Sequence, residues 1–255
     1  MSILLFFLFY VAAGLIAGGK LFTEVFGIDY EIAVVASVAI ILVYTLFGGF
    51  LAVSWTDIFQ GILILVALLL VPMLIFYKAG SYESFVDGIS DKNIYLLNIF
   101  ISTDGEQLSF IAIASAMAWG LGYFGQPHIL ARFKAIESPR HVRRAAFIGV
   151  LWAFSCYFLA IAVGLSGIFI IEQPLEDSEK VFITLTKFMF DPLVAGALLA
   201  TILAAIMSTV DSQLLVCSAS LAEDLYPLIS DRELVGDDRL KIARIAVVVL
   251  ALMGT

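Results

Sequence analysis

Four oxygen-bearing side chains lie close together in a strongly apolar segment and could hold a cation there. They are Ser208, Thr209, Asp211 and Ser212. In a helix, Ser208, Asp211 and Ser212 stand at i, i+3 and i+4 and share one face, with Thr209 beside it. Hydroxyl and carboxylate oxygens on one face suit a hard cation such as sodium. A hydrogen-bonded patch between packed helices is the alternative, because small hydroxyl residues favour close packing in membranes. The acid favours a functional site, since an ionisable group at membrane depth is costly.

A second acid, Asp57, is the single charged residue between Ile32 and Tyr77. It follows Thr56 at the expected start of a helix, where either residue would serve as an N-cap. Position alone therefore favours a structural cap, and a role in ion binding is the alternative.

The stretch WGLGYFGQPH, residues 119–128, is a poor composition for a continuous helix because it combines glycines with a proline. Unwound backbone at membrane depth is tolerated only against protein or a water-filled cavity, and transporters use such breaks to present backbone groups to substrates and ions. Trp119 and Tyr123 are four residues apart and could line such a cavity. A glycine-rich packing face with aromatic residues at the membrane interface is the alternative. His128 lies beyond the break and fits an interfacial residue better than a proton relay.

Composition places these residues in a membrane protein. Of 255 residues, 62% are hydrophobic and only 14% are charged, and the mean hydropathy is +1.06. Soluble domains carry about 25% charged residues, so a cytosolic globular enzyme, a secreted disulfide scaffold and a disordered chain are excluded. The net charge of −8 argues against a nucleic-acid partner. We expect no enzyme, since the sequence has no Ser/His/Asp set, metal box or phosphate loop, and Cys156 and Cys217 match no zinc or redox spacing.

The uncharged runs predict an all-α polytopic membrane protein, because a transmembrane helix needs about 20 apolar residues. The pair Gly48-Gly49 and the polar group at 54–57 indicate a turn between the second and third helices. The abrupt end of the last run indicates a fragment of a longer chain. Six complete transmembrane helices and a truncated seventh are expected at Ser2–Gly19, Ile32–Thr56, Ile58–Tyr77, Gln107–Pro127, Ala145–Ile171, Pro192–Ala222 and Ile245–Thr255.

The basic residues predict the orientation of these helices, because Lys and Arg concentrate in cytoplasmic loops. If the N-terminus is inside, the basic residues of the outer loops at 20–31, 78–106 and 172–191 are five lysines, with no arginine. The inner loops at 50–57, 128–144 and 223–244 hold every arginine of the chain. We therefore expect a cytoplasmic N-terminus. In the outer loop, 178–190 has apolar residues at helical spacing and is expected to lie along the outer interface.

Four stretches resemble the sodium/solute symporter family, and the last three look most like its proline-transporting branch. The resemblance runs over essentially the whole chain and keeps the order and spacing of the motifs. It implies a leucine-transporter-type core of two inverted five-helix repeats. The chain would be a single transmembrane domain, 1–255, running from about the third to the ninth core helix and therefore incomplete. The stretches are FFLFYVAAGLIAGGKLF, GGFLAVSWTDIFQG, WGLGYFGQPHILARF and ILAAIMSTVDSQLLVCSASLAEDLY.

The resemblance also implies roles for individual residues. Substrate contacts are implied for Tyr10, Trp119, Tyr123 and Pro127. Coupling sodium is implied at the carbonyl of Ala205 and the hydroxyls of Ser208 and Thr209. Asp57 matches an acid implicated in sodium dependence, and a second cation site, or a proton site, is implied at Asp57, Asp211 and Ser212.

The function implied is sodium-coupled symport of a small amino acid, with L-proline as the expected substrate, by alternating access. The partners would be sodium, the small-molecule substrate and the lipid bilayer of the cell membrane. Within the family, pantothenate, a sugar, sialic acid or a compatible solute remain alternatives. A heptahelical receptor or scaffold without transport, and an ion channel, are the alternatives from other classes.

Overall fold

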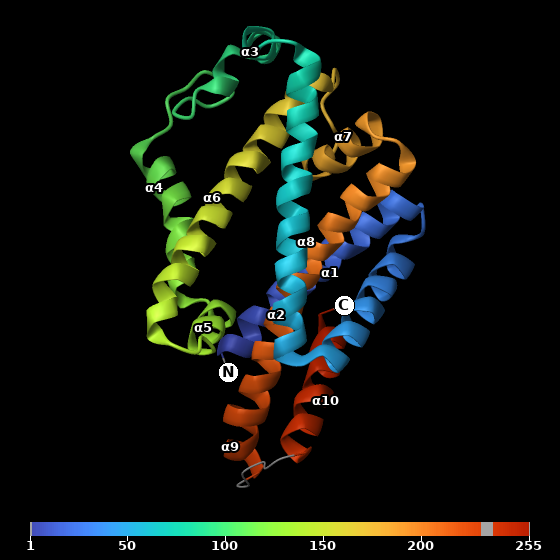
Figure 1. The fold of residues 1–255 in the computed structure, drawn as a ribbon, viewed down its shortest axis with the longest axis vertical. Helices are drawn as coiled ribbons and strands as arrows, with labels where there is room; N and C mark the ends of the chain where they lie inside the picture. The colour runs from blue at the N-terminus through green and yellow to red at the C-terminus, as the bar shows by residue number, and fades with distance from the viewer. Residues whose placement is uncertain (1, 231–236, 255) are drawn as a thin grey trace. The chain divides into compact units, whose positions relative to one another are not determined.

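The computed structural model describes residues 2–230 and 237–254, except for the side chains at positions 44, 47, 48, 119, 124 and 237. Within these ranges the chain is helical, with a single isolated β-bridge between Ile101 and Gln107. It forms two compact units, Met1–Ile64 with Leu199–Thr255, and Leu65–Leu198 (Figure 1). The all-α class expected from the sequence is therefore confirmed for the described residues.

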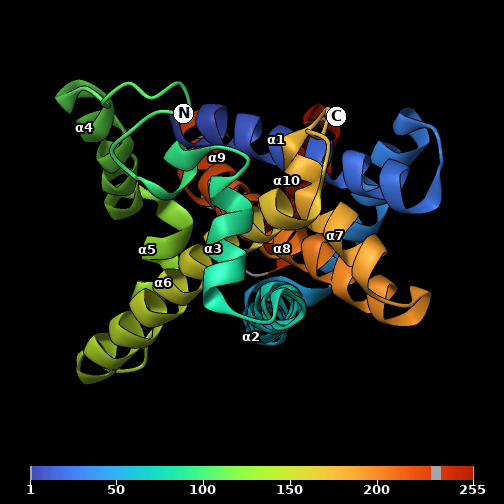
Figure 2. The same cartoon turned by 90° about the horizontal axis from the view of Figure 1, so that it is seen from above.

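The first unit contains α1 (Ser2–Phe26), the first part of α2 (Tyr30–Ala79) and most of α8 (Pro192–Ala219). A π-helical turn, η4 (Ser220–Leu225), leads into α9 (Tyr226–Ser230), and α10 (Asp237–Met253) packs against α1 (Figure 2).

Glycines of α1 allow the helices of this unit to approach closely. A Cβ on Gly18 would lie 2.9 Å from the Ser37 hydroxyl of α2, and a Cβ on Gly14 would collide with Val210 of α8. Small residues at helix contacts are the usual means of close packing in membranes. Gly14 and Gly18 therefore hold α1 against the two helices that carry the polar residues.

Helix α2 reverses direction at one glycine. Its 50 residues are too many for a single crossing, and Gly49 has φ 58° and ψ −174° (Figure 1), a conformation that is essentially restricted to glycine. The turn expected at the glycine pair is confirmed. The polar group at 54–57 is not part of it, because one glycine reverses the chain and the helix resumes at once, over Gly49–Ala79.

This geometry corrects the cap interpretation of Asp57. The residue lies eight positions beyond Gly49, within a continuous helix. An N-cap precedes the first helical turn, so Asp57 is not a cap and 50–57 is not a loop.

We expect Gly49→Ala to lower the thermal midpoint of the purified protein, because alanine strains the backbone at this φ by about 1–3 kcal/mol. A Cβ at position 49 meets nothing within 4 Å, so the effect isolates backbone strain from steric overlap. Gly196→Ala in α8 is the matched control, since position 196 also has open space and alanine favours a helix. Equal midpoints for the two variants would contradict a conformational role for Gly49.

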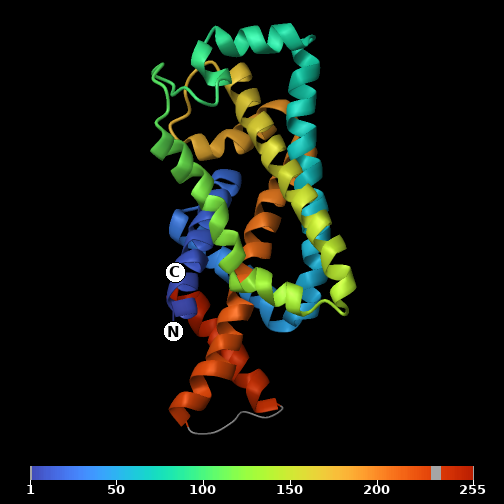
Figure 3. The ribbon, with the colours of Figure 1, turned by 90° about the vertical axis from the view of Figure 1, so that its left-hand side faces the viewer.

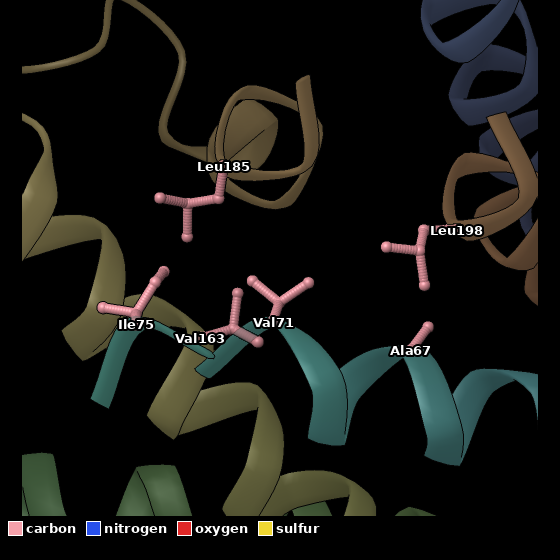
Figure 4. Close-up of a cluster of buried hydrophobic side chains, with 6 residues drawn as sticks. All are labelled: Ala67, Val71, Ile75, Val163, Leu185 and Leu198. Carbon is pink, nitrogen blue, oxygen red and sulfur yellow. The ribbon is translucent and has the colours of Figure 1, made fainter. Parts of the chain in front are cut away.

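The second unit packs around a cluster of buried side chains (Figure 4). The cluster joins the end of α2 to α6 (Pro139–Ile170), α7 (Val181–Met189) and the start of α8. Leu185 of α7 is fully buried, so the segment expected at 178–190 is helical and packs against the other helices of its unit. The members of the cluster are Ala67, Val71, Ile75, Val163, Leu185 and Leu198.

A short helix, α3 (Tyr82–Ser90), lies across the ends of α2 and α6 (Figure 3). Phe85 of α3 stands 5.9 Å from Phe76 of α2 and 5.1 Å from Phe169 of α6, measured between ring centroids. Edge-on and tilted ring pairs at these distances are attractive. A short 3-10 helix, η1 (Ile94–Leu97), then leads toward α4.

The helix expected at 107–127 is broken, as its composition predicts. It consists of α4 (Phe110–Ala118), a 3-10 segment η2 (Trp119–Gly125) and α5 (Pro127–Lys134). The break coincides with the glycines and the proline, which disfavour α-helix. Helix α6 begins at Pro139 rather than at Ala145, and α5 occupies 127–134, so most of the expected inner loop at 128–144 is helical.

In the described part of the chain, four helices are long and apolar enough to cross a membrane. Two shorter apolar helices, Tyr30–Val43 and Phe110–Tyr123, accompany them. The four helices are Ser2–Phe26, Gly49–Ala79, Pro139–Ile170 and Pro192–Ser230.

Candidate ion and substrate sites

The structure brings together the three groups expected to bind sodium. The hydroxyl of Ser208 donates to the carbonyl oxygen of Ala205 at 3.3 Å, and that of Thr209 donates to the same oxygen at 3.0 Å. The regular α8 backbone produces this cluster, because residues three and four positions apart stand on adjacent turns of one face. Two hydroxyl oxygens therefore lie within hydrogen-bond distance of one carbonyl oxygen.

Asp211, one turn further along α8, is fully buried. Its Oδ1 accepts a hydrogen bond from the Thr45 hydroxyl of α2 at 2.6 Å. Its Oδ2 is also buried and has no hydrogen-bond partner among the described residues. A buried carboxylate with one vacant oxygen is costly unless a cation or a proton compensates it.

Asp57 and Ser212 lie in the same unit as Asp211. Asp57 is close enough for its charge to act on Asp211, although the two acids are far apart in the sequence. The Ser212 hydroxyl is turned back along α8, where it donates to the carbonyl of Ser208 at 2.7 Å. The second cation site expected at Asp57, Asp211 and Ser212 stays a prediction.

The sequence pattern does not indicate a functional role for Thr45. A threonine in an apolar helix is an ordinary packing residue, and nothing in its local sequence indicates a partner in α8. The one available sequence signal is that Thr45 carries a hydroxyl within an apolar segment, four positions before Gly49. Its pairing with Asp211 requires the tertiary structure.

The residues expected to contact substrate divide between the two units. Tyr10 lies on α1 in the first unit, half exposed, with its ring edge-on to Phe7 at 6.2 Å. Tyr123 and Pro127 lie in the second unit, where Pro127 is the first residue of α5. The Trp119 side chain lies outside the described residues. The shared cavity expected for Tyr10, Trp119 and Tyr123 stays a prediction.

The second unit has an open, mostly apolar hollow at the broken helix. It measures about 470 Å³ and opens between η2 and α6. The side chain of Tyr157 of α6 is hydrogen-bonded to that of Tyr123, a contact the sequence did not indicate. The lining residues are Ala116, Met117, Gly120, Tyr123, Ala153 and Tyr157.

His128 follows the break, on α5. Burial, and then the positive charge of Arg132 one turn away, lower the pKa of His128 below its ordinary value. The neutral imidazole is therefore favoured at neutral pH.

A family model described as "Sodium:solute symporter family" matches residues 1–254. The chain belongs to the sodium:solute symporter family. Membership makes it a multi-pass cell membrane protein of a transporter family, in agreement with its apolar helices.

Curated relatives in this family are similar over nearly the whole chain. The high-affinity proline transporter PutP of Bacillus subtilis is 45% identical over 98% of this chain and 54% of its own length. The sodium/proline symporter of Escherichia coli K12 is 43% identical over 98% of this chain and 51% of its own length. That of Staphylococcus aureus is 44% identical over 99% and 49%, respectively. The chain thus spans about half the length of the relatives it matches.

A solved symporter has the same fold. The structure is described as the substrate-bound outward-open state of a Na⁺-coupled sialic acid symporter with a novel Na⁺ site. It aligns with 99% of this chain and 56% of its own, with a TM-score of 0.82 and 19% sequence identity. The leucine-transporter-type core expected from the sequence is therefore confirmed for the aligned region.

Proposed function

We propose that this chain is part of a sodium-coupled symporter that takes up L-proline by alternating access. The observation that carries the proposal is the similarity to curated proline symporters at 43–45% identity over nearly the whole chain. The convergence of Ala205, Ser208 and Thr209 supports it, since these residues supply neutral oxygen ligands of the kind sodium takes.

We further propose that residues 1–255 form one transmembrane domain that corresponds to about the third to the ninth core helix. The fact that the chain spans about half of each relative supports this correspondence. The oxygens of α8 would then provide part of the sodium coordination, and helices outside 1–255 would provide the rest.

Neutral ligands suit the coupling task. The Ala205 carbonyl and the hydroxyls of Ser208 and Thr209 carry dipoles and no charge, so they bind a monovalent cation loosely. Weak binding allows release on the side where sodium is scarce, and conduction and transport sites need this balance. Asp57, Asp211 and Ser212 would form a second cation site, supported by the buried Asp211 and the nearby Asp57.

Substrate would bind where the broken helix exposes backbone and aromatic side chains. Proline carries a carboxylate, a secondary ammonium and an apolar ring. The unwound backbone of η2 offers peptide groups to the charged ends, while Tyr10, Trp119 and Tyr123 would offer aromatic walls to the ring, with Pro127 ending the break. The arginines that cluster at 128–144 and 223–244, between the apolar segments, support a cytoplasmic N-terminus for this segment.

Counterflow in proteoliposomes tests this function. Vesicles containing a full-length symporter with this segment, loaded with unlabelled proline, should accumulate labelled proline from outside when sodium is present on both faces. A carrier exchanges the two pools, whereas a channel lets both run down and a receptor moves neither. Sodium-dependent counterflow that is competed by another solute and not by proline would reassign the substrate, and its absence for all solutes would contradict symport.

A further inference from the structure

The proposed function does not explain the contact between Thr45 and Asp211 in the first unit. The two residues are 166 positions apart, yet their side chains meet at 2.6 Å. Both are buried, Thr45 with 3% and Asp211 with 0% of its surface exposed. Neither residue can satisfy its polar group with water at this depth, so the geometry of the pair determines how Asp211 presents its charge.

The Thr45 side chain is held from two directions. Its Oγ1 lies 2.8 Å from the carbonyl oxygen of Ile41 and 2.6 Å from Asp211 Oδ1. Threonine in a helix has few allowed rotamers, and contact with the carbonyl four residues earlier selects one of them. Thr45 is thus a rigid hydroxyl aimed at the carboxylate.

This contact gives the two oxygens of the Asp211 carboxylate different environments. Oδ1 is occupied by the Thr45 hydroxyl, whereas Oδ2 is buried without a hydrogen-bond partner in the part of the chain that the structure describes. The neighbouring charge that acts on Asp211 is negative, that of Asp57. A bound cation would relieve both the vacant oxygen and the repulsion between the acids.

We propose that Thr45 is a positioning residue of the second cation site, which holds Oδ1 of Asp211 so that Oδ2 faces the cation. The inference rests on the proposed function, since it deepens the site assigned to Asp57, Asp211 and Ser212. Thr45 acts through Asp211 and does not itself need to touch the ion. Partners that orient metal ligands in this way typically contribute about 10–100-fold to metal affinity.

Sodium binding without transport tests the role. The thermal midpoint of the purified full-length protein is measured without proline as sodium replaces choline, and the midpoint rises according to sodium affinity. Thr45→Val, which keeps the shape and removes the hydroxyl, should raise the half-saturating sodium concentration about tenfold. Thr45→Ser keeps the hydroxyl and should restore the value of the unmodified protein.

Ser37→Ala is the matched control. Ser37 is a buried hydroxyl on the same helix, and it donates to the carbonyl of Ala33, four residues earlier, at 3.0 Å. It should leave the sodium titration unchanged. Thr45→Ala serves as a second variant should Thr45→Val not yield folded protein, and the same tenfold change is expected.

A double-mutant cycle with Asp211→Asn decides whether Thr45 acts through the acid. In that background Thr45→Val should cause no further change in sodium affinity. An equal loss in both backgrounds, or a Thr45→Val titration identical to that of the unmodified protein, would overturn the inference while leaving the proposed function intact. An unmodified protein that sodium does not stabilise over choline would instead contradict the proposed function.

Discussion

Replacing Ser208 and Thr209 together by alanine should raise the sodium concentration for half-maximal proline uptake by roughly 100-fold or more. The two hydroxyls donate to the same carbonyl oxygen, that of Ala205, and we propose that all three oxygens bind the coupling ion. Loss of an outer-shell partner alone costs metal sites about 10–100-fold in affinity, so loss of two direct ligands should cost at least as much. The measurement is initial uptake of labelled proline against external sodium, in a full-length symporter containing this segment.

Ser218→Ala on the same helix provides the control for this experiment. Its buried hydroxyl donates to the carbonyl of Leu215 at 2.8 Å, so the substitution removes a comparable hydrogen bond away from the proposed site. Sodium dependence should be unchanged. If the Ser208/Thr209 variant also keeps its sodium dependence, these residues are not ligands.

With sodium bound at both proposed sites, Asp211→Asn should reduce the sodium-to-proline flux ratio from two to one. Asparagine keeps the size of the side chain and removes the charge, so the second cation loses the ligand that compensates it. Asp57→Asn should weaken sodium dependence as well, because the two acids act on each other. The ratio is measured from parallel fluxes of labelled sodium and proline in proteoliposomes.

Asp191→Asn is the control, because Asp191 is an acid that precedes α8 and accepts from the backbone N–H of Leu193 at 3.1 Å. Asparagine caps a helix as well as aspartate does, so this variant should be silent. This capping argument does not apply to Asp57, which lies inside its helix, so Asp57→Asn is not expected to be silent. An unchanged flux ratio for Asp211→Asn would leave a single sodium site, that of Ser208 and Thr209.

Much of the architecture follows from local sequence. Apolar runs identify the helices that cross the membrane because each run must exceed the thickness of the hydrocarbon core. The break at 119–125 follows from glycine and proline, which destabilise α-helix whatever surrounds them. The spacing of Ala205, Ser208 and Thr209 places their oxygens together because a regular helix fixes that geometry by itself.

Helix boundaries follow less closely from the sequence where polar residues lie inside a helix. The polar residues Ser54 and Asp57 predict a turn, but the chain reverses at Gly49, and both residues are helical. Arg140 and Arg144 appear as loop residues, yet they belong to the first turns of α6. Polarity records where a segment meets water, whereas a helix continues as long as its backbone hydrogen bonds can form.

The sequence by itself determined that the chain is helical and membrane-embedded, where its helix breaks, and which polar residues of α8 share a face. Only the tertiary structure decided that Thr45 meets Asp211 and that Asp57 acts on the same acid. Helical periodicity relates residues within one segment, so it cannot state which face of α2 meets α8. That choice depends on close packing between distant segments, here through the small glycines of α1, because van der Waals contact is gained only where the two surfaces fit.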